Sequence, residues 1–398
     1  MVRANTFGLT ALLAALTGIG PLSTDMYLPS LPDIARDFTA TTAQTQLTIS
    51  TYLVGFAIGQ LIYGPLSDRY GRKPVLLAAL AIFCFASLAC MVAPSIDLLI
   101  VTRAIQAVGG CGGVVIARAV VRDVYSGARA GRELSLMSMV MAVAPVIAPL
   151  IGGAVQMLFG WRASFAVLTA SGVLIAALIW LYLPETLERR ATEPVSARSM
   201  LRSFGVFLSD GGYLAHCGMA ILVFAGLFAW ISASPFVLQN LYHLSAFAFG
   251  VSFAIASAGF MAGSLIASHF VSQWGIGRTL GFGALAQAVG GLLMVVALAA
   301  GLRSAAALVA PMAIYLVGLG LTLPQAMAGA MHPYKDRAGA ASSLIGFLQQ
   351  SGAALCGVAV AYFLGETAWP MAVAVALAGV ASMLLWVLTR DVRERALR

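Results

Sequence analysis

The stretch "GPLSDRYGRKPVLL", residues 64–77, joins two long apolar runs, at about residues 43–66 and 74–93, through a short charged turn. Each run is long enough for an α-helix to cross the roughly 30 Å of hydrocarbon in a bilayer. The turn contains Asp68, Arg69, Arg72 and Lys73, which belong at a membrane surface in contact with water. The stretch therefore predicts two membrane-spanning helices connected by a tight polar turn.

The composition extends this prediction to the whole chain. Of 398 residues, 61% are hydrophobic and only 10% are charged, so polar side chains cannot cover a water-soluble surface. Apolar runs of about 20 residues recur along nearly the whole length, whereas barrel strands would give short alternating segments. The fold class that follows is an all-α polytopic membrane protein.

Proline, glycine and charge clusters divide the chain into 12 predicted transmembrane helices, in two sets of six. The predicted spans are at about residues 7–28, 43–66, 74–93, 98–120, 133–158, 162–183, 209–236, 246–271, 279–301, 305–330, 338–364 and 369–389. We therefore predict an N-terminal six-helix bundle at residues 1–185, a linker at 186–205 and a C-terminal six-helix bundle at 206–398. The loops "LSDRYGRK" (66–73) and "FVSQWGIGR" (270–278) share an aromatic–glycine pair, which indicates that the two bundles are weakly similar repeats.

The distribution of Lys and Arg predicts the orientation in the membrane. If the chain starts in the cytoplasm, most of these cations fall on the cytoplasmic side, and only Arg36, Arg162 and Arg303 fall on the other. The positive-inside rule then places both termini in the cytoplasm. The formal net charge of +8 comes from these short loops, so no nucleic-acid partner is expected.

Two charged residues lie at matching depth inside predicted spans. Asp25, in "STDMYLP" (23–29), is close to the outer end of the first span, and Arg103, in "VTRAIQAVGG" (101–110), is close to the outer start of the fourth. A charge at membrane depth is costly and usually faces a partner or a cavity. We predict that Asp25 takes up and releases a proton and that Arg103, a permanent cation, is its electrostatic partner. The alternative is that the two are independent interfacial residues.

Polar and aromatic residues in the spans give a weaker prediction of a substrate site. Glutamine amides inside a membrane either bind a ligand or join helices, and aromatic residues near an interface often only anchor the helix. Both interpretations stay open. The predicted substrate-binding residues are Asp25, Tyr27, Gln106, Phe228, Trp230, Phe236, Gln349 and Gln350.

Four segments resemble signatures of the major facilitator superfamily. The stretch at 64–77 resembles the signature between the second and third spans, "RAIQAVGGCGG" (103–113) resembles the fourth-span motif of proton-coupled members, and "APVIAPLIGG" (144–153) resembles the fifth-span antiporter motif. "STDMYLPSLPDIARDF" (23–38) is similar to the opening of the bicyclomycin and chloramphenicol resistance branch (Bcr/CflA) of 12-span drug:proton antiporters. The resemblance implies the major facilitator fold, with two pseudo-symmetric six-helix bundles.

The resemblance also implies a function. It is proton-coupled efflux, by alternating access across a bacterial inner membrane, of small amphipathic drug-like compounds such as chloramphenicol- or bicyclomycin-type antibiotics. The implied partners are the small-molecule substrate, protons and the lipid bilayer. We expect a monomer, and no metal or cofactor is implied.

The loop and the fifth span are expected to control the conformational change. In the loop, Gly64 and Gly71 allow a tight reversal, and Asp68 can face positive groups. In the fifth span, prolines remove backbone donors and glycines permit close approach, so we expect a bent helix packed against the opposite bundle. The predicted gating residues are Gly64, Asp68, Arg69, Gly71, Arg72, Lys73, Pro145, Pro149, Gly152 and Gly153.

Other functions compete with this prediction. A proton-coupled importer or exporter of a small metabolite shares the fold and remains the alternative. An enzyme needs a catalytic pair or a metal cluster, whereas the histidines His216, His243, His269 and His332 are scattered without ligand spacing. A channel needs a symmetric pore-lining ring, of which the sequence gives no sign.

Overall fold

The computed structural model describes residues 7–125, 127–187 and 197–396, and the regular elements in these ranges are all helical. The predicted all-α membrane fold is therefore confirmed. The chain forms two compact units, Met1–Val195 (unit 1) and Ser196–Arg398 (unit 2). The predicted linker at 186–205 crosses this boundary; its residues 188–196 lie outside the described ranges, and helix α8 (Ala197–Leu208) begins within it.

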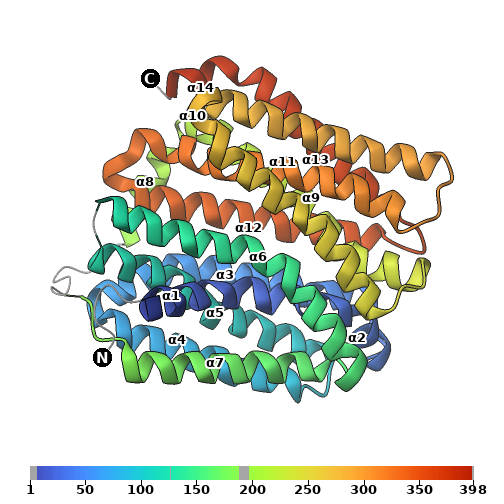
Figure 1. Cartoon of the computed structure of the whole chain (residues 1–398), viewed down its shortest axis with the longest axis horizontal. Coiled ribbons are helices and arrows are strands. Elements are labelled where there is room, and N and C mark those ends of the chain that lie inside the picture. The colour runs from blue at the N-terminus through green and yellow to red at the C-terminus, as the bar shows by residue number, and fades with distance from the viewer. Residues whose placement is uncertain (1–6, 126, 188–196, 397–398) are drawn as a thin grey trace. The chain divides into compact units, whose positions relative to one another are not determined.

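Unit 1 is built from long helices, and two short helical elements, η1 and α2, follow the first of them (Figure 1). Helix α1 packs against α6 and α5, α5 packs against α3 and α4, and α4 packs against α7. The elements are α1 (Phe7–Asp25), the 3₁₀ turn η1 (Leu28–Ser30), α2 (Leu31–Asp37), α3 (Thr42–Tyr70), α4 (Arg72–Met91), α5 (Ile96–Val124), α6 (Gly127–Phe159) and α7 (Arg162–Tyr182).

Unit 2 begins with α8 and continues through longer helices. Helix α9 packs against α11, α12 and α13, and α10 packs against α11 and α13. The remaining elements are α9 (Gly211–Phe236), the π-turn η2 (Val237–Leu241), α10 (Ala246–Ala299), α11 (Ala306–Met331), the 3₁₀ turn η3 (His332–Arg337), α12 (Ala338–Phe363), α13 (Trp369–Leu388) and α14 (Arg390–Ala396).

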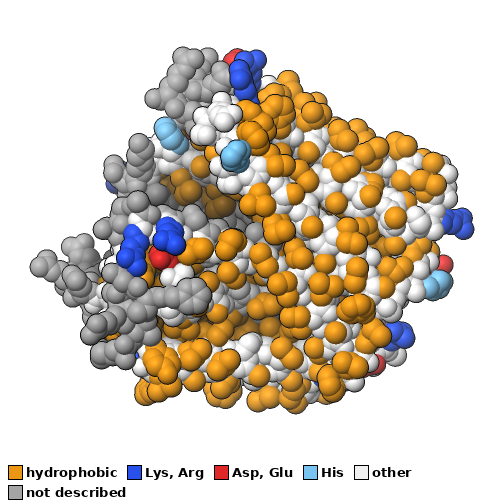
Figure 2. All heavy atoms as spheres, in the orientation of Figure 1, with side chains coloured by type: hydrophobic (Ala, Val, Ile, Leu, Met, Phe, Trp, Pro, Cys, Tyr) orange, Lys and Arg blue, Asp and Glu red, His pale blue; other side chains and the backbone are white. Residues whose placement is uncertain are grey.

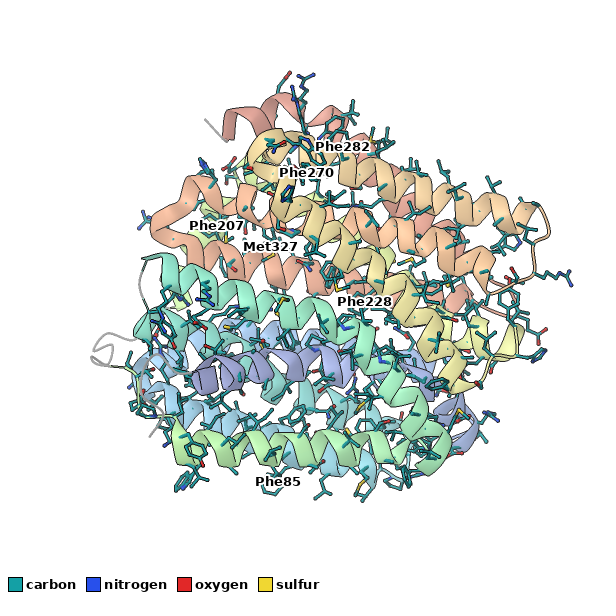
Figure 3. The ribbon with its side chains drawn as sticks, in the orientation of Figure 1. Phe85, Phe207, Phe228, Phe270, Phe282 and Met327 are labelled. Atoms are coloured by element: carbon teal, nitrogen blue, oxygen red, sulfur yellow. The ribbon has the colours of Figure 1, made fainter. Side chains whose placement is uncertain are left out.

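The described helices agree with the predicted spans. Eleven helical segments among the described residues are long and apolar enough to cross a bilayer. One of them, α10, has 54 residues and turns at Gly275, where φ is 74°, so it supplies two spans and the total becomes 12. The rings of Phe270 and Trp274 stack with centroids 4.8 Å apart, and Phe282 packs against Trp274 beyond the turn (Figure 3).

Local sequence explains where several helices begin and end. Helix α1 ends at Asp25 rather than at residue 28, because Pro29 has no N–H to bond the carbonyl of Asp25 and its ring would clash with that carbonyl in a continued α-helix. The amide of Gln44 donates to the hydroxyl of Thr41, and the Thr41 amide donates to the Gln44 side chain, which together cap the start of α3.

The charged turn between α3 and α4 differs from the prediction in one respect. Gly71 has φ of 101° and makes the reversal, as a residue without a Cβ can. Gly64 does not take part in it, because it lies inside α3. The expectation that Gly64 contributes to the turn is therefore wrong.

The surface is the one expected of a protein in lipid. Hydrophobic side chains cover most of the face shown in Figure 2, and charged groups appear mainly near its left and right edges. Phe85 projects outward from α4 and is 74% exposed (Figure 3). In a bilayer such side chains contact lipid and need no protein partner.

Candidate functional site

Asp25 is a buried carboxylate at the C-terminal end of α1. It is 6% exposed, and among the described residues no cation lies within ion-pair distance of it and no donor hydrogen-bonds it. The C-terminal end of a helix carries a partial negative charge, which disfavours a carboxylate. The position therefore suits a carboxyl group that gains and loses a proton more than a permanent anion.

Arg103 lies beside α1 at the level of Asp25 and is fully buried. Its Nη1 donates to the carbonyl of Ser23 at 3.1 Å and to Oε1 of Gln106 at 2.5 Å. The Gln106 amide in turn donates to the hydroxyl of Ser87 on α4 at 2.7 Å. These contacts join α1, α4 and α5 around one guanidinium.

Aromatic rings cover the guanidinium of Arg103. Its central carbon is 4.3 Å from the ring centroid of Tyr52 on α3, 4.7 Å from that of Tyr27 and 5.8 Å from that of Phe165 on α7. All three are within cation–π range. Tyr27 is held in place by its hydroxyl, 2.9 Å from the Thr48 hydroxyl. The sequence analysis missed Tyr52, although a tyrosine in an apolar run needs a partner for its hydroxyl.

The expected pairing of Asp25 with Arg103 is absent from this structure. The charge of Arg103 is met by a carbonyl, an amide oxygen and aromatic faces, and its Nε and Nη2 have no acceptor among the described residues. Tyr52 lies within electrostatic range of both charged residues. The structure thus places Asp25 and Arg103 in one site, but they do not form an ion pair with each other.

Two of the predicted substrate-binding residues hold Arg103 in this structure. Gln106 uses both its amide oxygen and its amide nitrogen within unit 1, and Tyr27 uses both its ring and its hydroxyl. Both residues are fully buried. Here they position Arg103 rather than offer free polar groups to a ligand.

The glycine-containing part of α6 contacts α1 of its own unit. A Cβ added to Gly152 would overlap the carbonyl oxygen of Met26, the residue after Asp25. One turn further along α6, the Gln156 amide accepts from the hydroxyl of Ser30 at 2.8 Å and donates to the carboxylate of Asp33. Gly152 therefore packs against α1 of its own unit, and packing of this helix against the opposite bundle stays a prediction. Its close approach fixes α6 against the end of α1.

The rest of the α6 motif lies as the sequence suggests within one helix. Pro145 and Pro149 are both inside α6, and Gly153 is buried beside Gly152. Beyond the end of α6, the indole of Trp161 donates to Asp37 of α2 at 2.7 Å. These contacts tie the short helix α2 to the α6–α7 connection.

The charged turn after α3 forms a network centred on Arg72. Its Nη1 donates to Asp68 at 2.5 Å and to the Ser67 hydroxyl at 2.8 Å, and its Nε donates to Asp123 of α5 at 2.8 Å. The side chain of Arg72 is buried, whereas those of Asp68 and Asp123 are 44% and 19% exposed. The network therefore joins α3, α4 and α5.

Glu185, which follows α7, completes the network. Its carboxylate accepts from the backbone amides of Arg72 at 2.9 Å and Lys73 at 3.2 Å, at the first turn of α4. An acid at a helix N-terminus is favoured by the helix dipole. The ammonium of Lys73 donates to the carbonyl of Trp180, whereas Arg69 lies over the ring of Tyr70. The sequence analysis missed both Glu185 and Asp123 as partners of the turn.

Glu133 is a second buried carboxylate that the sequence analysis missed. It lies near the start of α6 and accepts from the hydroxyl of Thr10 on α1 at 2.6 Å. Among the described residues, Asp25 and Glu133 are the only buried carboxylates. Both belong to the contact between α1 and α6, near its opposite ends.

The other predicted substrate-binding residues lie in unit 2, on the neighbouring helices α9 and α12. Phe228 packs against Phe224 at a centroid distance of 5.4 Å (Figure 3), and Phe236 and Gln349 are buried. The indole nitrogen of Trp230 and the amide oxygen of Gln350 are buried without a partner in the described part of the chain. These two groups remain able to hydrogen-bond a ligand.

Within the described ranges, no three His, Cys, Asp or Glu side chains come together as metal ligands would.

Comparison with known proteins gives consistent matches along the chain. The model of the Major Facilitator Superfamily matches residues 13–357. The chain is 30% identical over 371 residues to the "Bicyclomycin resistance protein homolog" of Haemophilus influenzae, covering 92% of each protein. It is 31% identical over 363 residues to "Multidrug resistance protein D" of Escherichia coli, covering 88% of each. The solved structure of the xylose transporter XylE from E. coli has a TM-score of 0.74 over 97% of both chains, at 13% identity, a likeness of fold alone.

Proposed function

Since the chain belongs to the major facilitator superfamily, in its bicyclomycin and chloramphenicol resistance branch, and is a membrane transporter rather than an enzyme, we propose that it exports small amphipathic compounds in exchange for protons. Compounds of the chloramphenicol or bicyclomycin type are the first candidates, because a relative at 30% identity is named for bicyclomycin resistance. We further propose that both termini lie in the cytoplasm of a bacterial cell and that the protein works as a monomer.

The observation that carries this proposal is the buried carboxylate of Asp25 beside a buried, permanent cation. Asp25 has no ion-pair partner among the described residues, and Arg103 is at the same level of α1. A carboxyl group in such a place can be neutral when it carries a proton and can be stabilised by Arg103 when it does not. In this proposal Asp25 carries the transported proton.

The proton gradient supplies enough free energy for export. One elementary charge moving through a potential of about 150 mV releases roughly 3.5 kcal/mol, since 100 mV corresponds to about 2.3 kcal/mol. Because about 1.4 kcal/mol corresponds to a factor of ten, a neutral substrate can be concentrated a few hundred-fold. A monocation exchanged for one proton moves no net charge, so only the pH difference drives its export.

Residues of unit 2 are proposed to contact the substrate. Trp230 offers an indole N–H and Gln350 an amide oxygen, both buried without a protein partner in the described ranges, and Phe228 and Phe236 offer apolar surface. A few polar groups within an apolar lining are the usual composition of a site for drug-like molecules. Gln349 is proposed to join the same surface of α12.

The Arg72 network and the α1–α6 contact are proposed to control alternating access. Breaking and reforming the bonds of Arg72 to Asp68 and Asp123 changes how α3, α4 and α5 are held at the charged turn. The contact of Gly152 with Met26 links α6 to the end of α1 that carries Asp25. In this proposal the two contacts favour different conformations.

The test is drug tolerance in bacterial cells that lack their own drug pumps. Cells making the normal protein are compared with cells making Asp25→Asn over a panel that includes chloramphenicol and bicyclomycin. We expect the normal protein to raise tolerance to at least one compound and Asp25→Asn to lose this effect. The matched control is Asp97→Asn, an exposed acid in the first turn of α5, which should behave as the normal protein does.

Equal tolerance with the normal protein and with Asp25→Asn would contradict the role of Asp25. Increased accumulation of a compound in cells that make the protein, driven by an inward proton gradient, would instead favour the importer.

A further inference from the structure

Tyr52 of α3 lies at the site of both charged residues, yet the proposed function gives it no role. Its ring centroid is 4.3 Å from the guanidinium carbon of Arg103, closer than that of any other ring in the site. It is also within electrostatic range of Asp25. Its hydroxyl makes a long hydrogen bond of 3.4 Å to the carbonyl of Gly20 and also interacts with the side chain of Ser23, whereas its contact with Arg103 is through the ring.

The guanidinium of Arg103 has one free edge. Nη1 already has two acceptors, and Tyr27 and Tyr52 lie against the guanidinium, whereas Nε and Nη2 have no acceptor among the described residues. The N–H groups of Nε and Nη2 point to the same side of the guanidinium. This pair is one of the edges that binds a carboxylate through two parallel hydrogen bonds.

Of the buried carboxylates among the described residues, Asp25 is the one at the level of Arg103 along α1. Arg103 already binds the carbonyl of Ser23, two residues before Asp25. Glu133, the other buried carboxylate among the described residues, accepts a hydrogen bond from Thr10, which lies 15 residues before Asp25. At 1.5 Å per residue this is roughly 22 Å along α1, too far for a contact with Arg103.

The remaining groups around Arg103 do not compete for its free edge. The titratable groups in its electrostatic range are Tyr27 from the turn after α1, Tyr52 from α3 and Cys90 from α4. Helix α7 contributes the uncharged ring of Phe165, and α5 itself contributes Gln106. Asp25 is therefore the acid with which the free edge can pair.

We propose that Tyr52 is a positioning residue for proton coupling, whose aromatic face holds Arg103 away from Asp25 while Asp25 carries its proton. This inference rests on the proposed function. When the proton leaves Asp25 for water, the carboxylate that remains binds the free edge of Arg103, and the guanidinium leaves the Tyr52 ring. When a proton returns, the ring regains the cation. Only the proton is transferred, and Arg103 stays charged throughout.

The proposal assigns the effect to the ring of Tyr52 and not to its hydroxyl. Tyr52→Phe keeps an aromatic face and removes only the hydroxyl, so Arg103 should remain held. Tyr52→Leu keeps an apolar side chain but removes the face, so Arg103 should pair with Asp25 more readily. An ion pair with a fixed cation favours the ionised carboxylate, and a lower pH is then needed to load the proton.

The experiment follows protonation of Asp25 directly and needs no substrate. The infrared absorption of the protonated carboxyl group is recorded against pH for the full-length protein in lipid nanodiscs, and the spectrum of Asp25→Asn is subtracted. We expect Tyr52→Phe to titrate with the midpoint of the normal protein. We expect the midpoint for Tyr52→Leu to fall by about one pH unit, a tenfold change in proton affinity. The free energy of such a change lies within the range for a desolvated cation–π contact.

An unchanged midpoint for Tyr52→Leu overturns the inference, and so does an equal shift for Tyr52→Phe, because the hydroxyl would then carry the effect. If the difference between normal protein and Asp25→Asn shows no titrating carboxyl at all, the proposed function fails as well, so the two failures are distinguishable.

Phenylalanines with increasing ring fluorination at position 52 keep the shape of the side chain and weaken the attraction of the ring face for a cation. Should Tyr52→Leu fail to fold, the midpoint must fall stepwise along this series, and a constant midpoint contradicts the inference.

Discussion

At Arg103, a permanent charge is buried beside a carboxylate without being paired with it. Taking a guanidinium out of water costs free energy, and the protein offsets this cost with the Ser23 carbonyl, the Gln106 amide and the faces of Tyr27 and Tyr52. None of these groups binds a proton near neutral pH. The arrangement keeps the cation in place without using the carboxylate of Asp25, as the proposed proton exchange at Asp25 requires.

Gln106 gives a residue-scale prediction. Gln106→Met removes the amide oxygen that accepts from Arg103 and the amide that donates to Ser87. Because a buried charged donor loses an acceptor, we expect the free energy of unfolding to fall by about 1–3 kcal/mol, and proton-coupled transport to weaken. Thermal unfolding in detergent and transport in vesicles measure the two effects.

Ser87→Ala is the control for this variant. It removes two neutral hydrogen bonds, from the Gln106 amide and to the carbonyl of Phe83, but it leaves the acceptor of Arg103 in place, so the loss should be smaller, about 0.5–1.5 kcal/mol. Equal losses for the two variants would show that Gln106 does not support Arg103.

Some residues of the site could be predicted from sequence and others could not, for a physical reason. Asp25 and Arg103 stand out because a charge in an apolar run is costly wherever the helix packs. Tyr52 and Gln156 are compatible with many environments, and their roles depend on which residue of a neighbouring helix lies opposite. A single sequence does not specify that register, so these contacts appear only in the structure.

At the scale of elements, α1 and α6 form a pair that runs in the same direction. Three contacts define it in order along both helices: Thr10 with Glu133, Met26 with Gly152, and Ser30, just beyond α1, with Gln156. The middle contact is the tightest, because it places a backbone carbonyl against a glycine. The position of Asp25 therefore depends on how closely α6 approaches.

Gly152→Ala tests this dependence. The added methyl group overlaps the Met26 carbonyl, so α1 must shift beside Asp25. We expect a loss of about 1–3 kcal/mol in stability and impaired proton-coupled transport. Thermal unfolding and transport assays read out both.

Gly205→Ala is the matched control, because Gly205 also lies inside a helix, α8, and a Cβ there meets nothing within 4 Å. Alanine is the better helix former, so this variant should be as stable as the normal protein or slightly more stable. If Gly152→Ala matched Gly205→Ala in both assays, the close contact of α6 with α1 would have no role in transport.

The charged turn gives a second prediction at this scale. Asp123 accepts from Arg72 between α5 and α4 and is 19% exposed, whereas Asp68 is 44% exposed and only four residues before Arg72 in the chain. We expect Asp123→Asn to cost about 1–3 kcal/mol of stability and Asp68→Asn to cost less than about 1 kcal/mol. Thermal unfolding of both variants and of Arg72→Ala measures this order, and a larger loss for Asp68→Asn would reverse our assignment of the main contact.

Helices were predicted from sequence more accurately than the contacts between them. Apolar runs of sufficient length specify the spans, and the single long helix α10 still contains two of them, separated at Gly275. The role of Gly152 could not be predicted in the same way. A glycine shows that some helix approaches closely, but not which one, and the approaching helix is α1 of the same unit.

At the scale of the whole molecule, acidic residues are distributed unequally between the two units. Helices α9, α10, α11, α12 and α13 contain no Asp or Glu, whereas α1 and α6 contain Asp25 and Glu133. Among the described helices long enough to span a membrane, those of unit 2 therefore offer no carboxylate for the proposed proton carriage, whereas unit 1 offers Asp25 and Glu133. Unit 2 contributes unpaired polar groups and aromatic surface, as on α9 and α12.

This division predicts that substitutions in unit 2 change substrate preference and leave proton coupling intact. Phe228→Ala removes a large apolar side chain of α9, so compounds that contact it should be transported less well, by about ten- to a few hundred-fold in relative efficiency. The number of protons moved per compound should not change. Transport of several compounds by one variant, with proton movement recorded in parallel, makes the comparison, and a loss of proton movement with retained transport would contradict it.

The most direct test of the account is proton movement on adding substrate to protein reconstituted in lipid vesicles that contain a pH-sensitive dye. Chloramphenicol and bicyclomycin serve as probes, and exchange of labelled for unlabelled compound shows that the protein still binds and moves each of them. We predict that the normal protein moves protons in the direction opposite to the compound, and that Asp25→Asn exchanges the compound without moving protons. Proton movement by Asp25→Asn equal to that of the normal protein would contradict the account.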